Sequence, residues 1–422
     1  MSALTRPPIA AMSPAEPSPR APQPVDQARH RLGFWMIALA FLIAMAFGTV
    51  PAPLYPLYQA NGGFSTLLIT VIFAVYAVGV VASLLLAGHV SDWMGRKQIL
   101  IPALGLELVA AAIFLTSQSL PWLIVARLIT GLGVGMLTAT ATAHLHELHT
   151  RHRPDASSQR FEAVSTAANI GGLGVGSLVA GVLAQYVDAP LRTPYLIFAG
   201  LLLLSIVAVM LTPETVEEKL VRPAYRPQRI SADHGDRPGY IVAATAGFAS
   251  FAVFGVFTSV APGFVVGVLQ HQSPALAGLV VFAVFGPAAA AQTLTSRMRP
   301  DTKLGTGLAA QGLGLVVLTV GMHATNLPAF LVGGAITGVG AGMLFKAAVG
   351  AVATMAAPEM RGEALAGLFL ISYLGLSLPA VGIGIFTRYV TATTAMTSLA
   401  VVLLLVLGAV ATLIRRRTSS QR

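Results

Sequence analysis

Long apolar runs recur throughout this chain, and they constrain its fold more than any other feature. There are about twelve such runs, each close to twenty residues long, the length at which a helix crosses a hydrocarbon core of roughly 30 Å. Hydrophobic residues make up 55% of the sequence and charged residues only 10%, a composition that excludes a water-soluble globule. We therefore predict an all-α integral membrane protein. The predicted spans are 34–57, 66–88, 98–117, 121–143, 162–186, 193–211, 239–268, 275–296, 304–322, 328–353, 364–387 and 393–414.

Polar segments divide the predicted spans into two sets of six. The first residues are rich in Pro, Ala, Ser and Arg, which cannot bury enough apolar surface to fold, and they lack the ordered features of a cleaved signal. The predicted organisation is a disordered tail at 1–31, a six-helix bundle at 32–211, a linker at 212–238, a second six-helix bundle at 239–414 and a basic tail at 415–422.

Two matches between the halves indicate an internal repeat. Residues 130–137 read TGLGVGML and residues 337–344 read TGVGAGML, while residues 160–163 and 361–364 both follow the pattern R-x-E-A. Each pair runs in the same direction and occupies the same place in its half, so we predict parallel repeats related by an axis along the membrane normal. Such a fold places its binding site between the halves, near the bilayer midplane.

Arginine and lysine are distributed unevenly between the two sides of the predicted spans. If the N-terminus is cytoplasmic, that side holds both tails, the linker and most basic loops, whereas the other side keeps only Arg192 and Arg388. We therefore expect both termini in the cytoplasm and a plasma-membrane location, the inner membrane of a bacterium. Each chain holds both halves of a complete pathway, so we expect a monomer.

A short loop of glycine and charge separates the second and third predicted spans. Its residues resemble the loop pattern G-x-x-x-D-R-x-G-R-R/K of the major facilitator superfamily (MFS), although Trp93 stands where arginine is common. The resemblance implies the twelve-helix MFS fold and a transporter. The matching residues are Gly88, Asp92, Gly95, Arg96 and Lys97.

Glycine patterns extend the resemblance toward the superfamily's drug:proton antiporters. Arg127 with the glycines that follow it resembles the pattern R-x-x-x-G-x-G, and a later glycine series resembles G-x-x-x-G-P-x-x-G-G, with Ser177 and Ala180 in place of a proline and a glycine. Residues 213–215, Pro-Glu-Thr, also resemble that group. Small residues pack membrane helices of every kind, so helix packing alone is the competing explanation. The glycines are Gly131, Gly133, Gly135, Gly172, Gly176 and Gly181.

The loop resembles a gate that holds one side of such a protein shut. The resemblance implies that Asp92 meets the positive dipole end of the helix that begins near Arg361 and Glu363. Arg96 would then pair with Asp92 and with Glu147, the local acid at the end of the fourth span. The alternative is that the basic residues of the loop only enforce topology.

Charges inside the spans are few, and each costs roughly 3 kcal/mol by insertion scales. Glu107 is the only acid within a span and is the candidate proton carrier; the alternative is a fixed counter-ion for Arg127, which lies at a similar depth. Arg127 is the candidate cavity residue, because the resemblance places its span beside the cavity. Lys346 either snorkels to water or favours anionic cargo. Tyr55 lies at the outer end of the first span, where no acid is present, which leaves neutral, amphipathic or anionic cargo open.

Other chemistries find no support in the sequence. There is no cysteine and no protease, esterase or phosphate-binding signature, so we expect neither an enzyme nor a bound cofactor or metal. The net charge of +10 is scattered over loops, so we expect no nucleic-acid partner. A histidine-rich segment, His144, His146, His149 and His152, suggests metal binding or pH sensing, but we expect it to be a solvated loop.

We expect a secondary active transporter that works by alternating access. Its partners would be a lipid bilayer, protons and a small-molecule substrate, and its function would be proton-coupled efflux of small organic compounds, as in a multidrug antiporter. The alternatives are a facilitator or importer of a metabolite, such as a sugar or an organic acid, and a non-transporting membrane receptor or scaffold.

Overall fold

The described part of the chain is helical throughout, with no strand. The computed structural model describes residues 24–87, 90–216, 227–228, 236–357 and 360–420. Within these residues, twelve helices are long and apolar enough to cross a membrane. The predicted all-α fold with twelve spans is therefore confirmed. The disordered tail predicted for 1–31 and the linker lie largely outside the described residues.

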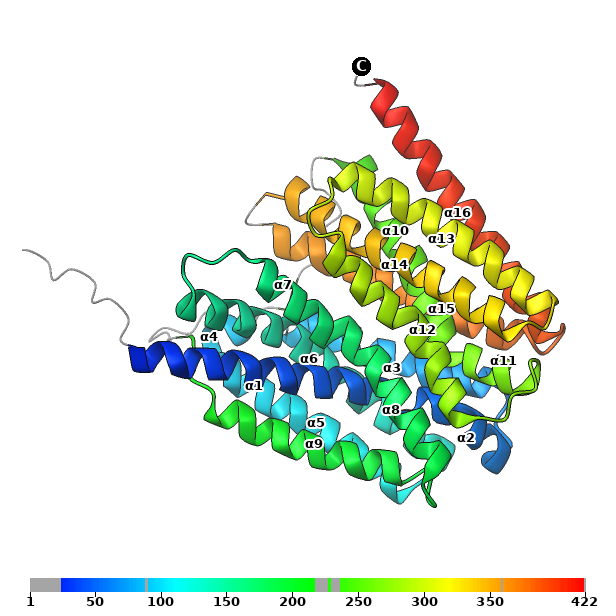
Figure 1. The fold of residues 1–422 in the computed structure, drawn as a ribbon, viewed down its shortest axis with the longest axis horizontal. Coiled ribbons are helices and arrows are strands. Elements are labelled where there is room, and N and C mark those ends of the chain that lie inside the picture. The colour runs from blue at the N-terminus through cyan, green and yellow to red at the C-terminus, as the bar shows by residue number, and fades with distance from the viewer. Residues whose placement is uncertain (1–23, 88–89, 217–226, 229–235, 358–359, 421–422) are drawn as a thin grey trace, which may run out of the picture.

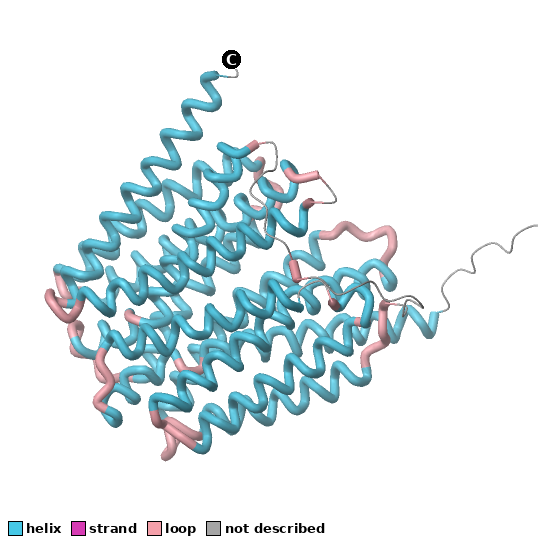
Figure 2. The backbone as a smooth tube through the Cα atoms, turned by 180° about the vertical axis from the view of Figure 1, so that it is seen from behind, coloured by secondary structure: helices cyan, strands magenta, loops and turns pink. Residues whose placement is uncertain are grey.

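The first bundle contains the helices α1 (Pro24–Thr49), η1 (Ala52–Leu54), α2 (Tyr55–Gly62), α3 (Thr66–Ala87), α4 (Ser91–Met94), α5 (Arg96–Thr116), α6 (Leu120–His152), α7 (Gln159–Thr166), η2 (Ala167–Gly171), α8 (Gly172–Tyr186) and α9 (Thr193–Leu211). The second contains α10 (Arg237–Ser259), α11 (Ala261–Gly267), α12 (Pro274–Leu294), α13 (Pro300–His323), α14 (Leu327–Met355), α15 (Arg361–Phe386) and α16 (Ala392–Ser420). Figure 1 shows the two bundles lying against each other, and Figure 2 shows the same arrangement from behind.

The first span differs from its prediction at both ends. α1 begins at Pro24, so residues 24–31 are helical where we expected disorder. The predicted continuous helix over 34–57 is interrupted after Thr49, and the chain continues as the short 3-10 helix η1 and then α2. Pro51 and Pro53 explain the break, because proline lacks an amide hydrogen and its ring clashes with the preceding turn.

α6 packs between α3 and α5 with no room for side chains at its glycines. A Cβ atom added to Gly131 would lie 2.2 Å from the carbonyl oxygen of Tyr76 in α3, and one added to Gly133 would lie 2.8 Å from that of Ala103 in α5. Both distances are shorter than non-bonded atoms tolerate. The backbones can therefore approach this closely only because glycine is present.

α14 repeats this arrangement in the second bundle. A Cβ atom on Gly338 would lie 2.3 Å from the carbonyl oxygen of Val284 in α12, and one on Gly340 would lie 2.2 Å from the backbone nitrogen of Gln311 in α13. α6 and α14 thus occupy equivalent places in their bundles, each between the second and third spans of its half. The parallel repeat predicted from the matching glycine sequences is confirmed.

The bundles meet where α3 packs on α15 and where α8 packs on α12. A Cβ atom on Gly181 of α8 would lie 2.5 Å from the carbonyl oxygen of Pro274 in α12. Nearby, the Ser273 hydroxyl donates a 3.0 Å hydrogen bond to the Gln185 side chain. These contacts lie at the end of the protein where α2 and α11 adjoin, called here the α2/α11 end (Figure 1). The opposite end, where Arg96 lies, is called the motif end.

Candidate functional site

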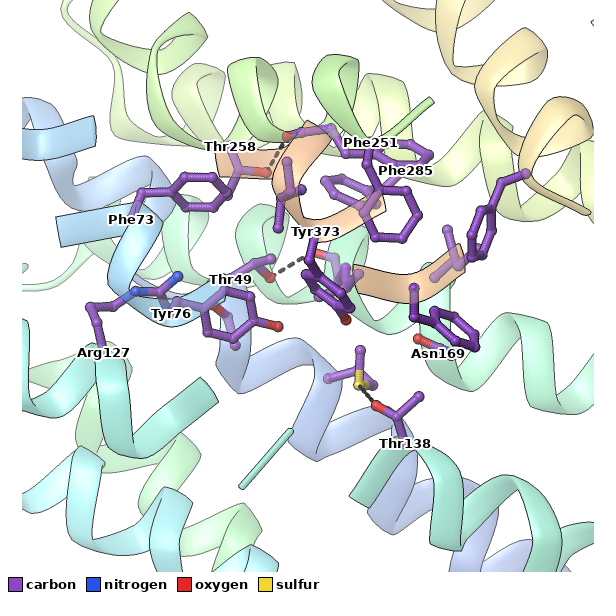
Figure 3. A pocket seen from close by; sticks show the side chains of 18 residues that line it. Thr49, Phe73, Tyr76, Arg127, Thr138, Asn169, Phe251, Thr258, Phe285 and Tyr373 are labelled. Carbon is purple, nitrogen blue, oxygen red and sulfur yellow. Dashed lines mark hydrogen bonds between the residues drawn. The ribbon is translucent and has the colours of Figure 1, made fainter. Parts of the chain in front are cut away.

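A cavity of about 100 Å³ lies between the two bundles, deep within the membrane-spanning region. Its wall is contributed by α1, α3, α6, η2 and α8 of the first bundle and by α10, α12, α14 and α15 of the second. Figure 3 shows Arg127 and Tyr76 on one side of this space and Phe251 and Phe285 on the other. The wall is mainly aromatic, with Phe73, Tyr76, Phe251, Phe254, Phe285, Phe345, Phe369 and Tyr373.

Arg127 is the one charged residue among the described residues that line this cavity. Its side chain is 1% exposed, and its Nη1 atom donates a 2.8 Å hydrogen bond to the Gly48 carbonyl oxygen. The guanidinium carbon lies 4.4 Å from the ring centre of Tyr76 and 6.0 Å from that of Phe73, both within the range of cation–π attraction. The structure thus places Arg127 in the cavity, as expected from the sequence.

In the described structure Glu107 does not pair with Arg127, so the alternative in which Glu107 is a fixed counter-ion for Arg127 is wrong. Glu107 is fully buried in α5, and neither of its carboxyl oxygens has a hydrogen-bond partner in the part of the chain that the structure describes. Its Cγ atom lies against α6, where a Cβ atom on Gly133 would come within 2.9 Å of it. The arginine instead turns toward α1 and the aromatic rings of α3. Glu107 is absent from the described residues that line the cavity, and its role as the proton carrier stays a prediction.

Lys346, which we expected either to snorkel to water or to line the cavity, and the candidate Tyr55 are not among the described residues that line it. The Lys346 ammonium is 3.6 Å from a Glu162 carboxyl oxygen and donates a 2.9 Å hydrogen bond to the Gln292 carbonyl oxygen. Because Glu162 is in α7 and Lys346 in α14, this ion pair joins the bundles at the motif end. Tyr55 is buried in α2, and its hydroxyl has no hydrogen-bond partner.

Asn169 is a cavity residue that the sequence did not indicate. It lies in η2, one turn of π-helix inserted between α7 and α8, and its side chain lines the cavity (Figure 3). π-Helical turns are rare and occur most often at functional sites, because the extra residue rotates the side chains that follow. Only the asparagine itself, a polar residue in an apolar span, was a signal for this position.

At the motif end, Arg96 forms the contact with Glu147 that the loop pattern implied. The Nη2 atom of Arg96 lies 2.7 Å from Oε1 of Glu147, and its Nε atom lies 3.3 Å from Oε2. This two-point geometry is the strongest form of an arginine–carboxylate pair. The Nη1 atom donates a 2.6 Å hydrogen bond to the Ser91 hydroxyl. Gly88 and the side chain of Asp92 lie outside the described part of the structure.

Glu214 is a second acid in this network, from the Pro-Glu-Thr segment after α9. Its carboxylate accepts hydrogen bonds from the backbone amides of Arg96 and Lys97, at 3.1 and 2.9 Å, and so caps the N-terminus of α5. Gly95, just before this helix, has a φ of 112°, a value that favours glycine. Burial raises the pKa of Glu214, but the hydrogen bonds from backbone amides outweigh burial and lower its pKa from 4.5.

The remaining gate candidates are more loosely held. The Lys97 ammonium donates a 2.7 Å hydrogen bond to the Met210 carbonyl oxygen, which ties α5 to the end of α9. Arg361 is exposed and Glu363 half-buried in the first turn of α15. With the Asp92 side chain undescribed, the implied contact between the loop and α15 stays a prediction.

The histidine segment is not a solvated loop, and that expectation is wrong. α6 continues to His152, and both His144 and His149 are buried. The His144 ring lies 3.2 Å from the Pro213 carbonyl oxygen, and the His149 ring lies 3.3 Å from that of Ser157. These contacts join the end of α6 to the segment after α9 and to the loop before α7. Among the described residues, no three potential ligands converge as a metal site would require.

The other candidate glycines lie at close helix contacts. A Cβ atom on Gly172 would lie 2.9 Å from the Leu42 carbonyl oxygen of α1, and one on Gly176 would lie 2.0 Å from that of Ala46. On α6, a Cβ atom on Gly135 would lie 2.7 Å from the carbonyl oxygen of α3 residue Val80. In this state of the protein these glycines serve helix packing.

Comparison with known proteins identifies the family to which this architecture belongs. The sequence model of the Major Facilitator Superfamily matches residues 37–262, more than half of the chain. The chain belongs to the major facilitator superfamily. A relative, an uncharacterised MFS-type transporter of Mycobacterium tuberculosis (strain ATCC 25618 / H37Rv), is 25% identical over 177 residues. That match spans 40% of this chain and 30% of the relative.

Two solved structures share the MFS fold over 90% of this chain and 99% of theirs. The human organic anion transporter MFSD10 (TETRAN) has a TM-score of 0.64 at 16% identity. A variant of the nucleoside transporter NupG has a TM-score of 0.70 at 12% identity. At these identities the likeness establishes the fold alone. Membership of the superfamily points to a transporter rather than an enzyme.

Proposed function

We propose that this MFS protein is a secondary active transporter that exports small organic compounds in exchange for protons, by alternating access. The observation that carries the proposal is the aromatic-rich cavity with walls from both bundles. A rocking motion of one bundle against the other would open such a cavity to either side in turn. In the present structure, Gly181 packs against Pro274 at the α2/α11 end, and this is the contact that would close that end in the proposed cycle.

The motif end carries the polar contacts of the proposed gate. Between the bundles, Lys346 meets Glu162, and Arg297 donates a 2.8 Å hydrogen bond to Gln159. Exposed polar contacts of this kind contribute little each, so they can break and re-form as the bundles move. Within the first bundle, the Arg96–Glu147 pair would hold the loop in position. We assign Gly88, Asp92, Gly95, Lys97, Arg361 and Glu363 to the same gate by resemblance.

Glu107 is the proposed carrier of the coupled proton. A carboxylate in a membrane interior without a hydrogen-bond donor is costly, whereas its protonated form is tolerated. Glu107 is fully buried, and neither carboxyl oxygen has a hydrogen-bond partner among the described residues. Glu107 packs against α6, the helix that also carries Arg127. A shift of α6 on protonation of Glu107 would therefore also move Arg127 in the cavity.

The orientation follows from the basic residues. We propose that the motif end faces the cytoplasm of a bacterium and the α2/α11 end faces outward, because arginine and lysine are concentrated at the motif end. The protein would act as a monomer in the inner membrane, in the manner of the twelve-helix drug:proton antiporters. With export of the compound and entry of the proton, the protein would be an efflux antiporter.

The test is proton movement in proteoliposomes that contain a trapped pH-sensitive dye. A panel of aromatic acids, alcohols and amines is added across an imposed pH gradient, with wild type, Glu107→Gln and Asp188→Asn. Asp188 is an exposed acid outside the spans and serves as the matched control. We expect at least one compound to dissipate the gradient with wild type and with Asp188→Asn, but not with Glu107→Gln.

Other outcomes separate the alternatives. If compounds cross the membrane with wild type but never move protons, the protein is a facilitator and the antiporter proposal fails. If Glu107→Gln still couples compounds to protons, the assignment of the proton to Glu107 fails while antiport stands.

A further inference from the structure

We infer that the cavity takes one-ring aromatic organic anions, with Arg127 binding the anionic group and the phenylalanine wall enclosing the ring. The inference rests on the proposed function, since it names the cargo of the same cavity. Three independent features of the cavity carry it: its uncompensated charge, its hydrogen-bonding groups and its size.

The charge of Arg127 has no counter-ion in the structure. In the described part of the chain, no carboxylate oxygen lies within the 4.0 Å ion-pair distance of its guanidinium. The side chain is 1% exposed, and its Nε atom is buried without a partner. A buried, unpaired cation is costly, and a bound anion would remove much of that cost. The cavity therefore favours an anionic guest over a cationic one.

The other polar groups of the wall offer little to a guest. The hydroxyls of Thr138 and Thr258 donate to backbone carbonyls within their own helices, and the Thr49 hydroxyl donates a 2.6 Å hydrogen bond to the Leu173 carbonyl oxygen of α8. Asn169, Tyr76 and Tyr373 are the polar side chains that remain to assist Arg127 (Figure 3). A sugar needs many hydrogen bonds to replace its water, and this wall cannot supply them. A guest with one polar group and an apolar body matches the wall.

The apolar part of the cavity fits an aromatic ring. Phe254 and Phe285 stack with ring centres 4.7 Å apart, and Phe251 and Phe345 lie at the same centre distance. Aromatic rings pack favourably against one another in such offset or edge arrangements. These rings belong to the second bundle, whereas Arg127 belongs to the first. A guest that touches both would therefore bridge the two bundles.

The volume limits the guest to one ring. The cavity measures about 100 Å³, whereas an apolar protein cavity of roughly 150 Å³ binds benzene and drug-sized ligands occupy roughly 300–1,000 Å³. A phenyl ring with a carboxylate or sulfonate is therefore the largest guest that we expect, and it requires the wall to widen around it. A two-ring compound does not fit this state of the cavity.

The test measures equilibrium binding to the full chain in lipid nanodiscs by calorimetry. The probes are benzenesulfonate, benzyl alcohol, benzylamine and naphthalenesulfonate, which separate the effects of charge and size. Benzenesulfonate is a permanent anion, so its charge does not depend on pH. We expect it to bind roughly 10- to 100-fold more tightly than the alcohol and the amine, because only the anion pairs with Arg127. We expect naphthalenesulfonate to bind more weakly than benzenesulfonate.

Two variants locate the effect. Arg127→Gln is expected to lose the preference for the anion while still binding benzyl alcohol, which also reports that the variant is folded. Arg192→Gln removes an exposed arginine at the start of α9 and is expected to leave all affinities unchanged.

The inference is overturned if wild type binds benzylamine as tightly as benzenesulfonate, if no probe binds, or if Arg127→Gln keeps the preference for the anion. These outcomes differ from failure of the proposed function. If benzenesulfonate binds through Arg127 but no probe crosses the proteoliposome membrane, the cavity assignment stands and the transport proposal fails.

Discussion

The contact between α8 and α12 gives the sharpest prediction about conformational change. Gly181→Ala adds a Cβ atom 2.5 Å from the Pro274 carbonyl oxygen and 3.0 Å from the Cα atom of Gly278. Both neighbours are backbone of the opposite bundle and cannot rotate away. The substitution therefore forces the bundles apart at the α2/α11 end, and it disfavours the state in which that end is closed.

The size of the effect follows from the depth of the clash. Relief of the contact requires the two backbones to separate by roughly 1 Å, the scale of overpacking that costs about 1–3 kcal/mol. Applied to a two-state equilibrium, this free energy raises the population open at the α2/α11 end roughly 5- to 150-fold.

The chain has no cysteine, so a single introduced thiol reports on this opening. Ser177 is fully buried in α8, and its carbonyl oxygen lies 2.4 Å from where a Cβ atom on Gly278 would be. In a Ser177→Cys background, a membrane-impermeant thiol reagent should react faster once Gly181→Ala is added, by the factor given above. Gly200→Ala is the matched control, because nothing lies within 4 Å of its added Cβ atom. Equal reaction rates in the parent, Gly181→Ala and Gly200→Ala would refute the assignment of this contact as the closing one.

Three further predictions concern the stability of the folded protein in nanodiscs. Glu147→Gln leaves the Arg96 guanidinium without its carboxylate and should lower the free energy of unfolding by about 1–3 kcal/mol; an unchanged melting temperature would contradict the pair's structural role. Because the pKa of Glu214 is lowered from 4.5 on folding, its stabilisation is present above that pH and is lost as the pH falls through the lower folded-state value. The difference in melting temperature between wild type and Glu214→Gln should therefore be present near neutral pH and shrink as the pH falls below 4.5, and a constant difference would argue against the cap. Glu107→Leu should raise the melting temperature, because an unpartnered buried carboxyl costs about 1–3 kcal/mol, whereas a lower value would indicate a partner for Glu107.

The sequence predicted the spans and the repeat well because both depend on patterns that lipid and close packing impose. A run of apolar residues must become a helix in a bilayer, since no water is present to satisfy the backbone. Glycines such as Gly131 and Gly338 were recognisable because a close helix contact tolerates few other residues. Arg127 could be recognised from the sequence because a charge within a membrane span is costly, and such charges usually mark a functional site.

The cavity wall was not predictable, because it depends on how each helix is rotated. The π-helical turn at η2 changes that rotation within one span and brings Asn169 to the cavity, and no local pattern specifies such a turn. The pairing of Glu107 with Arg127 looked favourable from depth alone, but depth does not say in which direction a side chain points. Arg127 in fact reaches the backbone of Gly48 in α1.

The most direct test of the account is accumulation of radiolabelled benzenesulfonate in proteoliposomes with an acidic lumen. A permanent anion does not cross lipid by itself, and potassium with valinomycin removes any contribution from membrane potential. The account predicts that wild-type protein concentrates benzenesulfonate in the lumen as protons leave, and that both Glu107→Gln and Arg127→Gln abolish this accumulation. Entry that never exceeds the outside concentration, or accumulation that persists when the pH gradient is collapsed, would contradict it.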